Sequence, residues 1–468
     1  MKTIITFLMV VAFSGSLIAQ EMAIVPDKLK EPDATKVPWD GIETGWQNGA
    51  DRRDSSVFKN TSMAKYFMPY MFLDIAYTRS EANPIDNTVV GSTALARDNE
   101  VQLNSLNFGA DLFYGNARGR FMTQFGTRSE VVPRNDLSPY KGQYDLADVY
   151  RYLAEAYAGY HFNVWYGINI DMGMFMSYVG LNSYYQNENW EYQASYTSDN
   201  TPWFFNGIRT QIWPTKYLKI EPWIINGWQS YGMFNSMPGF GGNITWMPSS
   251  RFKILTNDYY GTDDAGIPGR KRFHSDNSYE LRYFNNPKSK KISKAAFSLT
   301  VDFGNEKGAG VNGFNNSEPL TNPAQYFLSA MVYHRLWFDH DHYAWTIGGG
   351  VMDNPGRYLV LAPTGEASPF PNPYNPTQPA GLFPFTENPG DQFKGWDMST
   401  NFDFMPNQSL TFRIELVTRH ASVPYFAGHG GVTSSTGYTT TPVDPNGTWR
   451  PDLVKEDNRI IFVMLFRL

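Results

Sequence analysis

From Lys65 onward the sequence repeats one unit, a segment of about 10 residues in which apolar and polar side chains alternate, followed by a turn. The clearest segment runs from Ala295 to Phe303, where every odd position is apolar and every even position is small or polar. Successive side chains of a β-strand point to opposite faces of the sheet. The alternation therefore predicts strands with one apolar face, and a chain of such strands needs either a shared core or a lipid bilayer to cover that face.

The pattern predicts about 16 strands, an even number, as is usual for single-chain bacterial membrane barrels. The predicted strands lie at 65–78, 101–114, 117–128, 150–162, 166–178, 203–213, 216–227, 238–247, 251–260, 271–284, 293–304, 325–338, 342–352, 393–405, 408–420 and 457–468.

The connections between these segments alternate between tight and long. The tight ones are Gly115-Asn116, Asn163-Val164, Pro214-Thr215, Pro248-Ser249 and Pro406-Asn407. The long ones are 79–100, 129–149, 179–202, 305–324, 353–392 and 421–456. Short periplasmic turns and long outer loops are typical of transmembrane barrels. We therefore predict that residues 65–468 form an all-β fold, a transmembrane antiparallel up-and-down β-barrel in the outer membrane, with short periplasmic turns and long extracellular loops.

Composition agrees with a barrel rather than with membrane helices. No segment after the N-terminus approaches the roughly 18 continuous apolar residues of a membrane helix. Mean hydropathy is -0.42, yet aromatic residues reach 16% and charged residues only 18%. Alternating strands explain this combination, because inward polar residues mask the apolar face in the average. A soluble β protein with an aromatic core is the alternative, and the parity of the loops argues against it.

The N-terminus has the features of a secretory signal peptide at residues 1–19. Lys2 precedes an apolar run from Ile4 to Phe13, and small residues lead to Ala19. Residues 20–64 are polar and contain prolines, so we expect a periplasmic arm or a plug. The absence of cysteine excludes a lipid-modified N-terminal cysteine, disulfides and thiolate metal sites. A net charge of -6 argues against nucleic-acid binding.

Aromatic residues cluster near both ends of the predicted strands, as expected for belts at the two lipid headgroup levels. Those near short turns are Trp165, Tyr166, Trp213, Tyr217, Trp246, Trp337, Phe338 and Tyr343. Those near long loops are Tyr178, Trp203, Trp228, Tyr259 and Trp396.

A barrel of this size leaves a water-filled lumen, so functional residues are expected at inward positions. The candidate lumen-lining residues are Arg118, Arg120, Arg128, Glu155, Arg209, Lys219, Glu221, Arg282, Arg413 and Glu415. Basic residues outnumber acidic ones in this set, which favours a mildly anion-selective pore. The alternative is that these are wall residues paired across neighbouring strands.

Few other motifs carry chemistry. The sequence from Asp339 to His342 alternates aspartate and histidine and could bind Zn²⁺ or Cu²⁺ if it were extended. Because it falls on a predicted periplasmic turn, we expect a solvated turn there and no metal or cofactor. No Gly-x-Ser-x-Gly motif is present, so we expect no enzyme and no catalytic residues. The proline-rich run from Pro363 to Pro389 cannot pair as a strand, and it predicts a mouth constriction or a surface loop.

The middle of the chain resembles the OmpL-like β-barrel porin family, which is abundant in Bacteroidetes-type bacteria. The resemblance rests on short motifs that are specific through their order and spacing, among them Glu155-Ala156-Tyr157, Gly173-Met174-Phe175, Glu188-Asn189-Trp190, residues 195–203, Asn226-Gly227-Trp228-Gln229, Asn257-Asp258 and Arg272-Phe273-His274. It covers residues 65–300 and implies an outer-membrane pore without catalytic residues.

The leading function is therefore an outer-membrane porin for passive diffusion of small hydrophilic solutes, surrounded by outer-membrane lipid. A homo-oligomer is one arrangement that the sequence leaves open. One alternative is a barrel that anchors or seals a larger assembly with outer-membrane protein partners. Another is a carrier of apolar substrates with a lumen lined by Met172, Met174 and Met176. These methionines share a face with Ile168 and Ile170, which suits lipid contact better.

Overall fold

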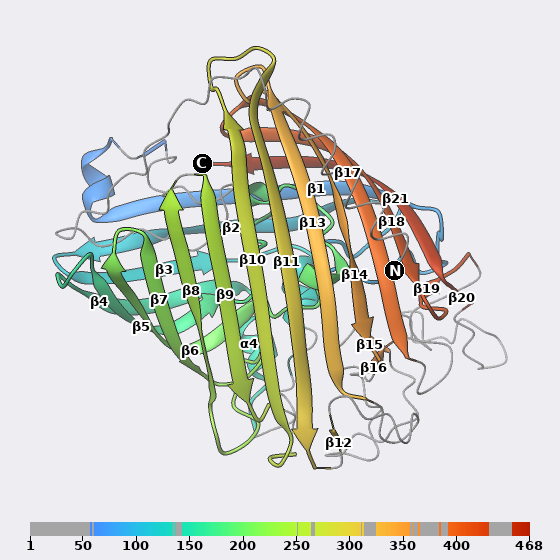
Figure 1. The fold of residues 1–468 in the computed structure, drawn as a ribbon, viewed down its shortest axis with the longest axis horizontal. Coiled ribbons are helices and arrows are strands. Elements are labelled where there is room, and N and C mark those ends of the chain that lie inside the picture. The colour runs from blue at the N-terminus through green and yellow to red at the C-terminus, as the bar shows by residue number, and fades with distance from the viewer. Residues whose placement is uncertain are drawn as a thin grey trace.

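Residues 57–58, 60–133, 136, 143–249, 251–263, 267–309, 311–312, 324–355, 358, 364–365, 383–384, 392–429 and 452–468 are described by the computed structural model. Within them the chain forms a closed antiparallel barrel of sixteen strands, as predicted (Figure 1). The barrel strands are β1 (Phe67–Ser80), β2 (Val101–Tyr114), β3 (Ala117–Thr123), β4 (Leu153–Phe162), β5 (Ile168–Met176), β6 (Phe204–Thr215), β7 (Leu218–Ile225), β8 (Gly239–Ser249), β9 (Phe252–Gly261), β10 (Lys271–Asn285), β11 (Ile292–Gly308), β13 (Tyr326–Phe338), β14 (Tyr343–Asn354), β17 (Phe393–Asn407), β18 (Leu410–Ala421) and β21 (Glu456–Arg467).

Each barrel strand pairs with its neighbours in sequence, and β1 closes the barrel by pairing with β21 from Phe72↔Arg467 to Ser80↔Arg459. In the front wall of Figure 1 the short turns lie at the top and the long connections at the bottom. The C-terminus lies at the short-turn end. Because β1 pairs with β21, the sheet has no open edge, as a membrane-spanning sheet requires.

The alternation in the sequence separates the two faces of the wall. On β11, Val301 and Phe303 are exposed on the outer face, whereas Asp302 between them is completely buried inside. On β5, Met172 is exposed outside while Asp171 and Phe175 are buried inside. Met172 therefore belongs to the outer face, whereas Met174 is buried and Met176 borders a cavity inside the barrel. The outward Met172 disfavours a lumen lined by all three methionines.

Three predicted tight turns begin two residues later than expected. Pro214, Pro248 and Pro406 each lie inside a strand, where the register with the next strand shifts. Proline has no backbone N–H, so it is tolerated at such bulges, where no ladder hydrogen bond is lost. The turns follow at 216–217, around 250–251 and at 408–409.

Short elements lie outside the barrel ladder. The helices are η2 (Ser62–Lys65), α3 (Arg128–Val131), α4 (Leu146–Tyr150), η5 (Gln186–Glu188) and α5 (Tyr196–Asp199). The short strands are β12 (Val311–Asn312), β15 (Thr364–Gly365), β16 (Phe383–Pro384), β19 (Phe426–Ala427) and β20 (Leu453–Val454). Among the residues that the structure describes, no helix is long and apolar enough to span a bilayer.

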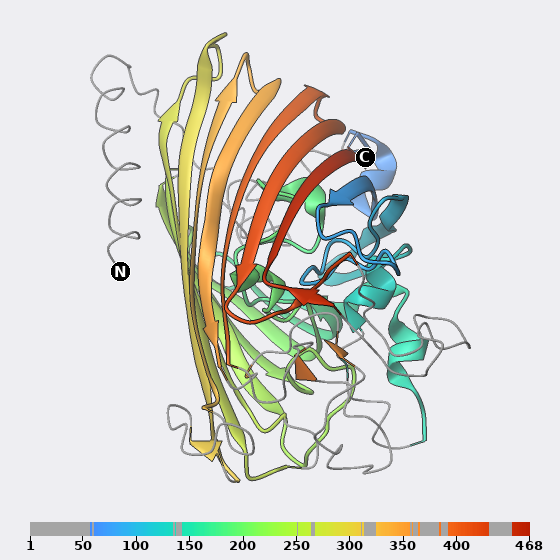
Figure 2. The same cartoon turned by 90° about the vertical axis from the view of Figure 1, so that its right-hand side faces the viewer.

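The connection between β5 and β6, residues 177–203, lies inside the barrel, and we call it the inner segment. The sequence analysis predicted a long outer loop at 179–202. That prediction is wrong, because the segment lies inside the barrel. Nearly all of its side chains are buried, and α5 contacts β13, β14 and β17. Figure 2 shows its short helices, in pale green, behind the strands of the wall. The barrel interior is therefore partly filled with polypeptide.

The predicted outer aromatic belt is largely wrong for the same reason. Tyr178 and Trp203 belong to the inner segment, Trp228 packs against Tyr259, and Tyr259 faces inward. Trp396 alone of that group is exposed on the outer wall. Near the short turns, Trp165, Tyr217, Trp246 and Tyr343 are exposed as predicted, whereas Trp213 is buried and Trp337 packs against Trp190 of the inner segment.

The predicted signal peptide at 1–19 lies outside the described residues. So do most of the arm at 20–64 and most of the proline-rich run.

Candidate functional site

Two wall carboxylates hold the backbone of the inner segment. Glu415 on β18 accepts hydrogen bonds from the backbone N–H groups of Tyr192 (2.6 Å) and Gln193 (3.0 Å). Asp397 on the adjacent strand β17 accepts from the backbone N–H of Tyr196 (2.8 Å) and from Ser195 Oγ (2.9 Å). Each carboxyl group accepts two hydrogen bonds from the segment, so these two residues fix the path of the segment across the lumen.

Wall arginines bind the carbonyl groups of the same stretch. Arg335 on β13 donates to Trp190 O at 2.9 Å, and Arg413 on β18 donates to Asn189 O at 3.0 Å. Both guanidinium groups also pair with Asp403. Arg419 donates to the carbonyl of Ala194 and pairs with a carboxylate of α5 at 2.6 Å. The wall thus recognises the backbone of the segment through both its donors and its acceptors.

Tyrosine hydroxyls of the segment reach further strands of the wall, β1 and β4 among them. Tyr192 Oη donates to Asp74 on β1 at 2.7 Å, and Tyr185 Oη donates to Glu155 on β4 at 2.7 Å. Tyr184 Oη donates to Gln124 at 2.5 Å. The segment is therefore tied to strands on both sides of the barrel.

Wall glycines leave the space that the segment occupies. A Cβ at Gly350 on β14 would lie 2.4 Å from Ser195 Oγ, and one at Gly395 on β17 would lie 2.9 Å from the ring of Tyr196. On β8, a Cβ at Gly241 would lie 1.8 Å from the hydroxyl of Tyr178. A larger residue at these positions would displace the segment, so the wall is shaped to receive it.

The inner face of the wall formed by β2 to β7 carries a network of ion pairs. Arg120 lies between Asp111 (2.5 Å) and Glu155 (3.4 Å). Asp171 lies between Arg118 (3.4 Å) and Arg209 (3.0 Å). All six side chains are buried on the inner face.

The network continues on β7, where Lys219 pairs with Glu221 at 2.5 Å. Glu221 also accepts hydrogen bonds from Gln211 (3.2 Å) and from Trp223 Nε1 (2.9 Å). Four basic and four acidic side chains therefore alternate along this wall.

A cavity of about 70 Å³ lies between this wall and the start of the inner segment. It has space for a few water molecules. The charged residues that line it are Arg120, Glu155, Arg209, Lys219 and Glu221. The residues on its other side come from the inner segment, among them Tyr178, Asn182, Tyr184, Tyr185 and Trp203.

The extracellular end of the interior holds a further contact. Tyr358 receives a hydrogen bond from Arg272 on its carbonyl (2.7 Å), and its hydroxyl lies 3.0 Å from His274 Nδ1. Gly304 on β11 leaves room for the Tyr358 ring, because a Cβ there would lie 2.3 Å from the hydroxyl. The start of the predicted 353–392 loop therefore reaches the inner face at this residue.

The predicted lumen residues fall into three groups in the structure. Arg118, Arg120, Glu155, Arg209, Lys219 and Glu221 form the ion-pair network beside the cavity. Arg413 and Glu415 hold the inner segment. Arg282 lies near the short-turn end of β10, where its strand pairing is shifted.

Arg128 was predicted wrongly to continue the row of Arg118 and Arg120 on one strand. β3 ends at Thr123, and Gly126 adopts a φ of +104°, which turns the chain out of the ladder. Arg128 then begins the short helix α3 and packs over the ring of Tyr184, with its guanidinium carbon 4.0 Å from the ring centre.

The sequence analysis missed the acidic partners Asp111, Asp171 and Asp403. Strand alternation would have placed all three on inward positions beside the arginines they bind. It also missed Asp397 as an anchor, although alternation along 393–405 puts Asp397 on the polar face, opposite to Trp396 and Met398. The partners of Asp397 lie in a segment that was assigned to the outside.

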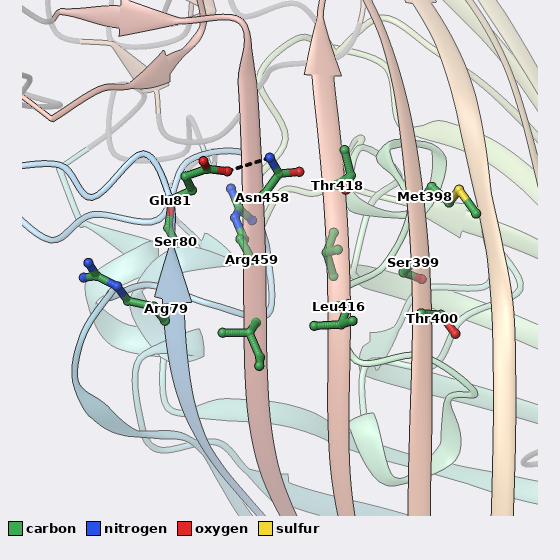
Figure 3. A pocket seen from close by; sticks show the side chains of 12 residues that line it. Arg79, Ser80, Glu81, Met398, Ser399, Thr400, Leu416, Thr418, Asn458 and Arg459 are labelled. Carbon is green, nitrogen blue, oxygen red and sulfur yellow. Dashed lines mark hydrogen bonds between the residues drawn. The ribbon is translucent and has the colours of Figure 1, made fainter.

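A second hollow, of about 600 Å³, lies on the outer surface of the wall across β1, β17, β18 and β21 (Figure 3). Met398, Leu416 and Thr418 border it, and Asn458 donates a hydrogen bond to Glu81 at its rim (2.7 Å). Met398, Leu416 and Thr418 are outward residues of their strands, so this hollow is separate from the lumen.

Comparison with solved structures finds other outer-membrane proteins. The structure is similar to the outer membrane channel DcaP of Acinetobacter baumannii, with a TM-score of 0.47 and 11% identity over 86% of this chain and 97% of that chain. It is similar to OmpT of Vibrio cholerae, with a TM-score of 0.47 and 8% identity over 86% and 97% of the two chains. It is also similar to an anion-selective porin from Comamonas acidovorans, with a TM-score of 0.47 and 6% identity over 86% and 99%.

A search of curated proteins finds no match to the sequence. The family model described as "Putative beta-barrel porin-2, OmpL-like" matches residues 71–338, which is more than half of the chain and runs from within β1 to the end of β13. This match agrees with the resemblance noted from short motifs and with the closed barrel. The chain belongs to the OmpL-like beta-barrel porin family and is an integral outer-membrane channel for small solutes.

Proposed function

We propose that solutes pass between the inner segment and the wall formed by β3 to β8, and that the inner segment sets the size limit of the channel. The observation that carries this proposal is the cavity between the ion-pair network and residues 176–185. On the opposite side, the segment is hydrogen-bonded directly to β17 and β18.

The path carries little net charge. Its four basic side chains are each within 4 Å of an acidic partner, so the basic excess expected from the sequence is offset by the acids Asp111 and Asp171. We therefore propose a channel with weak preference between small anions and cations, in place of the mildly anion-selective pore expected from the sequence. Neutral hydrophilic solutes fit this polar, charge-balanced wall.

Removal of the inner segment tests the size limit. A Cβ at Gly180 would lie 3.3 Å from Thr201 Oγ1, so the two ends of the segment are adjacent. A short Gly-Ser linker in place of residues 181–200 closes this gap without moving β5 or β6. We expect the deletion variant to fold as a heat-resistant barrel and to show higher single-channel conductance in planar bilayers, with faster entry of large sugars into liposomes.

The dense packing of the lumen supports one other candidate, a barrel that seals or anchors a larger outer-membrane assembly. The same experiment separates the two. A native protein that passes no ions, combined with an open deletion variant and stoichiometric partners after gentle purification, would favour the sealed barrel. A native protein with a measurable, size-limited conductance favours the channel.

The remaining parts of the proposal rest on sequence. We propose that residues 1–19 direct export and are removed, that residues 20–64 form a periplasmic arm, and that lipid covers the outer apolar face. The protein is proposed to lack catalytic activity and resident cofactors, and to self-associate through its outer wall.

A further inference from the structure

The periplasmic turn between β13 and β14 has a backbone conformation that the sequence did not reveal. Asp339, His340 and Asp341 adopt φ values of +47°, +57° and +70°, three consecutive left-handed residues of which none is glycine. L-residues rarely adopt this conformation, and a run of three is unusual. The sequence predicted a solvated turn here, with metal binding only if the chain were extended. The observed turn instead curls tightly and gathers its side chains.

Three metal-ligand side chains meet in this turn. One donor atom each of Asp339, His340 and His342 can be chosen so that all lie within 4.8 Å of one another. The imidazole rings of the two histidines are 6.4 Å apart between centroids. All three side chains are partly exposed, so an ion from the periplasm can reach them.

Both imidazoles are already oriented. His342 Nδ1 lies 2.7 Å from the backbone carbonyl of Asp339, so the neutral ring donates its proton there and leaves the Nε2 lone pair free. His340 Nδ1 lies 3.1 Å from Asp339 Oδ1. Metal-binding histidines commonly donate their second ring N–H to a carbonyl or carboxylate, which fixes the tautomer and the ring orientation.

The fourth residue of the motif is held away from this group. Asp341 accepts a hydrogen bond from Ser293 Oγ at 2.6 Å and pairs with Lys294 on β11. Its charge is therefore neutralised by the neighbouring strand. One carboxylate and two imidazoles remain to bind an ion.

We propose that Asp339, His340 and His342 form a binding site for a first-row divalent cation, Zn²⁺ or Cu²⁺, at the periplasmic mouth of the barrel. Two imidazole nitrogens and one carboxylate oxygen are the donors that these borderline cations prefer, whereas Ca²⁺ and Mg²⁺ prefer oxygen alone. Water completes the coordination. The site is independent of the solute path and goes beyond the channel function.

Titration of the purified, tag-free barrel tests the site. Zn²⁺ binding is followed by calorimetry, and Cu²⁺ binding is followed by electron paramagnetic resonance, in which nitrogen ligands give resolved hyperfine structure. We expect one equivalent to bind with two nitrogen ligands, and we expect binding to weaken in acid because protons compete for the imidazoles. Replacement of both histidines, His340→Ala with His342→Ala, should abolish saturable binding.

A matched pair of variants separates coordination from general attraction. Asp339→Asn and Asp341→Asn each remove one negative charge from the same turn. Coordination predicts that only Asp339→Asn weakens binding, by about 10-fold or more. Equal weakening by both variants, a spectrum without nitrogen coupling, or unchanged binding in the double histidine variant would overturn the proposal. The exposed turn lets all variants fold, and a heat-resistant band on gels confirms this.

Discussion

Loss of the Glu415 carboxylate should release the inner segment from the wall. In Glu415→Ala, the backbone N–H groups of Tyr192 and Gln193 lose their acceptor while Arg413 keeps its pair with Asp403. A buried N–H group that loses its acceptor costs about 1–3 kcal/mol, so the two groups together cost about 2–6 kcal/mol. Because Glu415 is completely buried, solvent screens these bonds little.

Water that enters the vacated space will recover part of this free energy. The lower end of the range still corresponds to a change of about 30-fold in the ratio of held to released segment. We therefore expect single-channel recordings of Glu415→Ala to show frequent transitions to a higher conductance. Chymotrypsin should also cleave the variant within the inner segment, where the native barrel protects the tyrosines.

Two control variants make this test specific. Glu415→Gln keeps one carbonyl acceptor of nearly the same shape, and it should show a smaller effect. Glu456→Ala removes an exposed carboxylate at the rim of β21 and should leave the conductance unchanged. A folded Glu415→Ala barrel with native conductance and native protease resistance would refute the view that Glu415 anchors the segment.

Three further substitutions test other parts of the structure. Gly350→Leu should displace Ser195 from the wall. Sugars of larger size should then enter liposomes that contain the variant. An unchanged size limit for sugar entry would mean that the segment adapts to the leucine. The double variant Arg118→Gln with Arg120→Gln removes two positive charges and takes the arginine partner from Asp111 and Glu155, while Asp171 keeps Arg209. The reversal potential in a salt gradient should then move toward cation selectivity, and a value equal to the native one would place the ion path elsewhere. Val301→Arg puts a guanidinium on the outer face of β11. It should lower the free energy of unfolding in liposomes, measured by urea titration, by up to about 2–4 kcal/mol. An unchanged free energy of unfolding would argue against lipid contact there.

The charge balance shows how a sequence inference can be correct in part. Alternation places Arg118 and Arg120 on the same inward row, and the structure has both on the inner face. The same rule places Asp111 and Asp171 inside, but the predicted set of lumen residues did not include them. Ion selectivity depends on the sum of neighbouring charges. Without these two aspartates the predicted lumen residues had a basic excess, whereas in the structure each arginine and lysine of this wall has an acidic partner.

The strands were predictable because their information is local. A period of two residues marks each strand, and the parity of long and short connections orders them into a barrel that closes β1 on β21. Proline positions shifted three turns by two residues, because a bulge can absorb a proline within a strand. Such shifts do not alter which face meets lipid.

The position of the inner segment was decided by tertiary structure alone. Its sequence is rich in aromatic and polar residues, which suits an outer loop as well as a lumen. What directs it inward is complementarity with residues more than a hundred positions away: carboxylates at Asp397 and Glu415 that match its N–H groups, and space at Gly350 and Gly395. Alternation along a strand states only that a side chain faces the lumen. Which distant backbone it binds there depends on how the closed barrel brings its walls together.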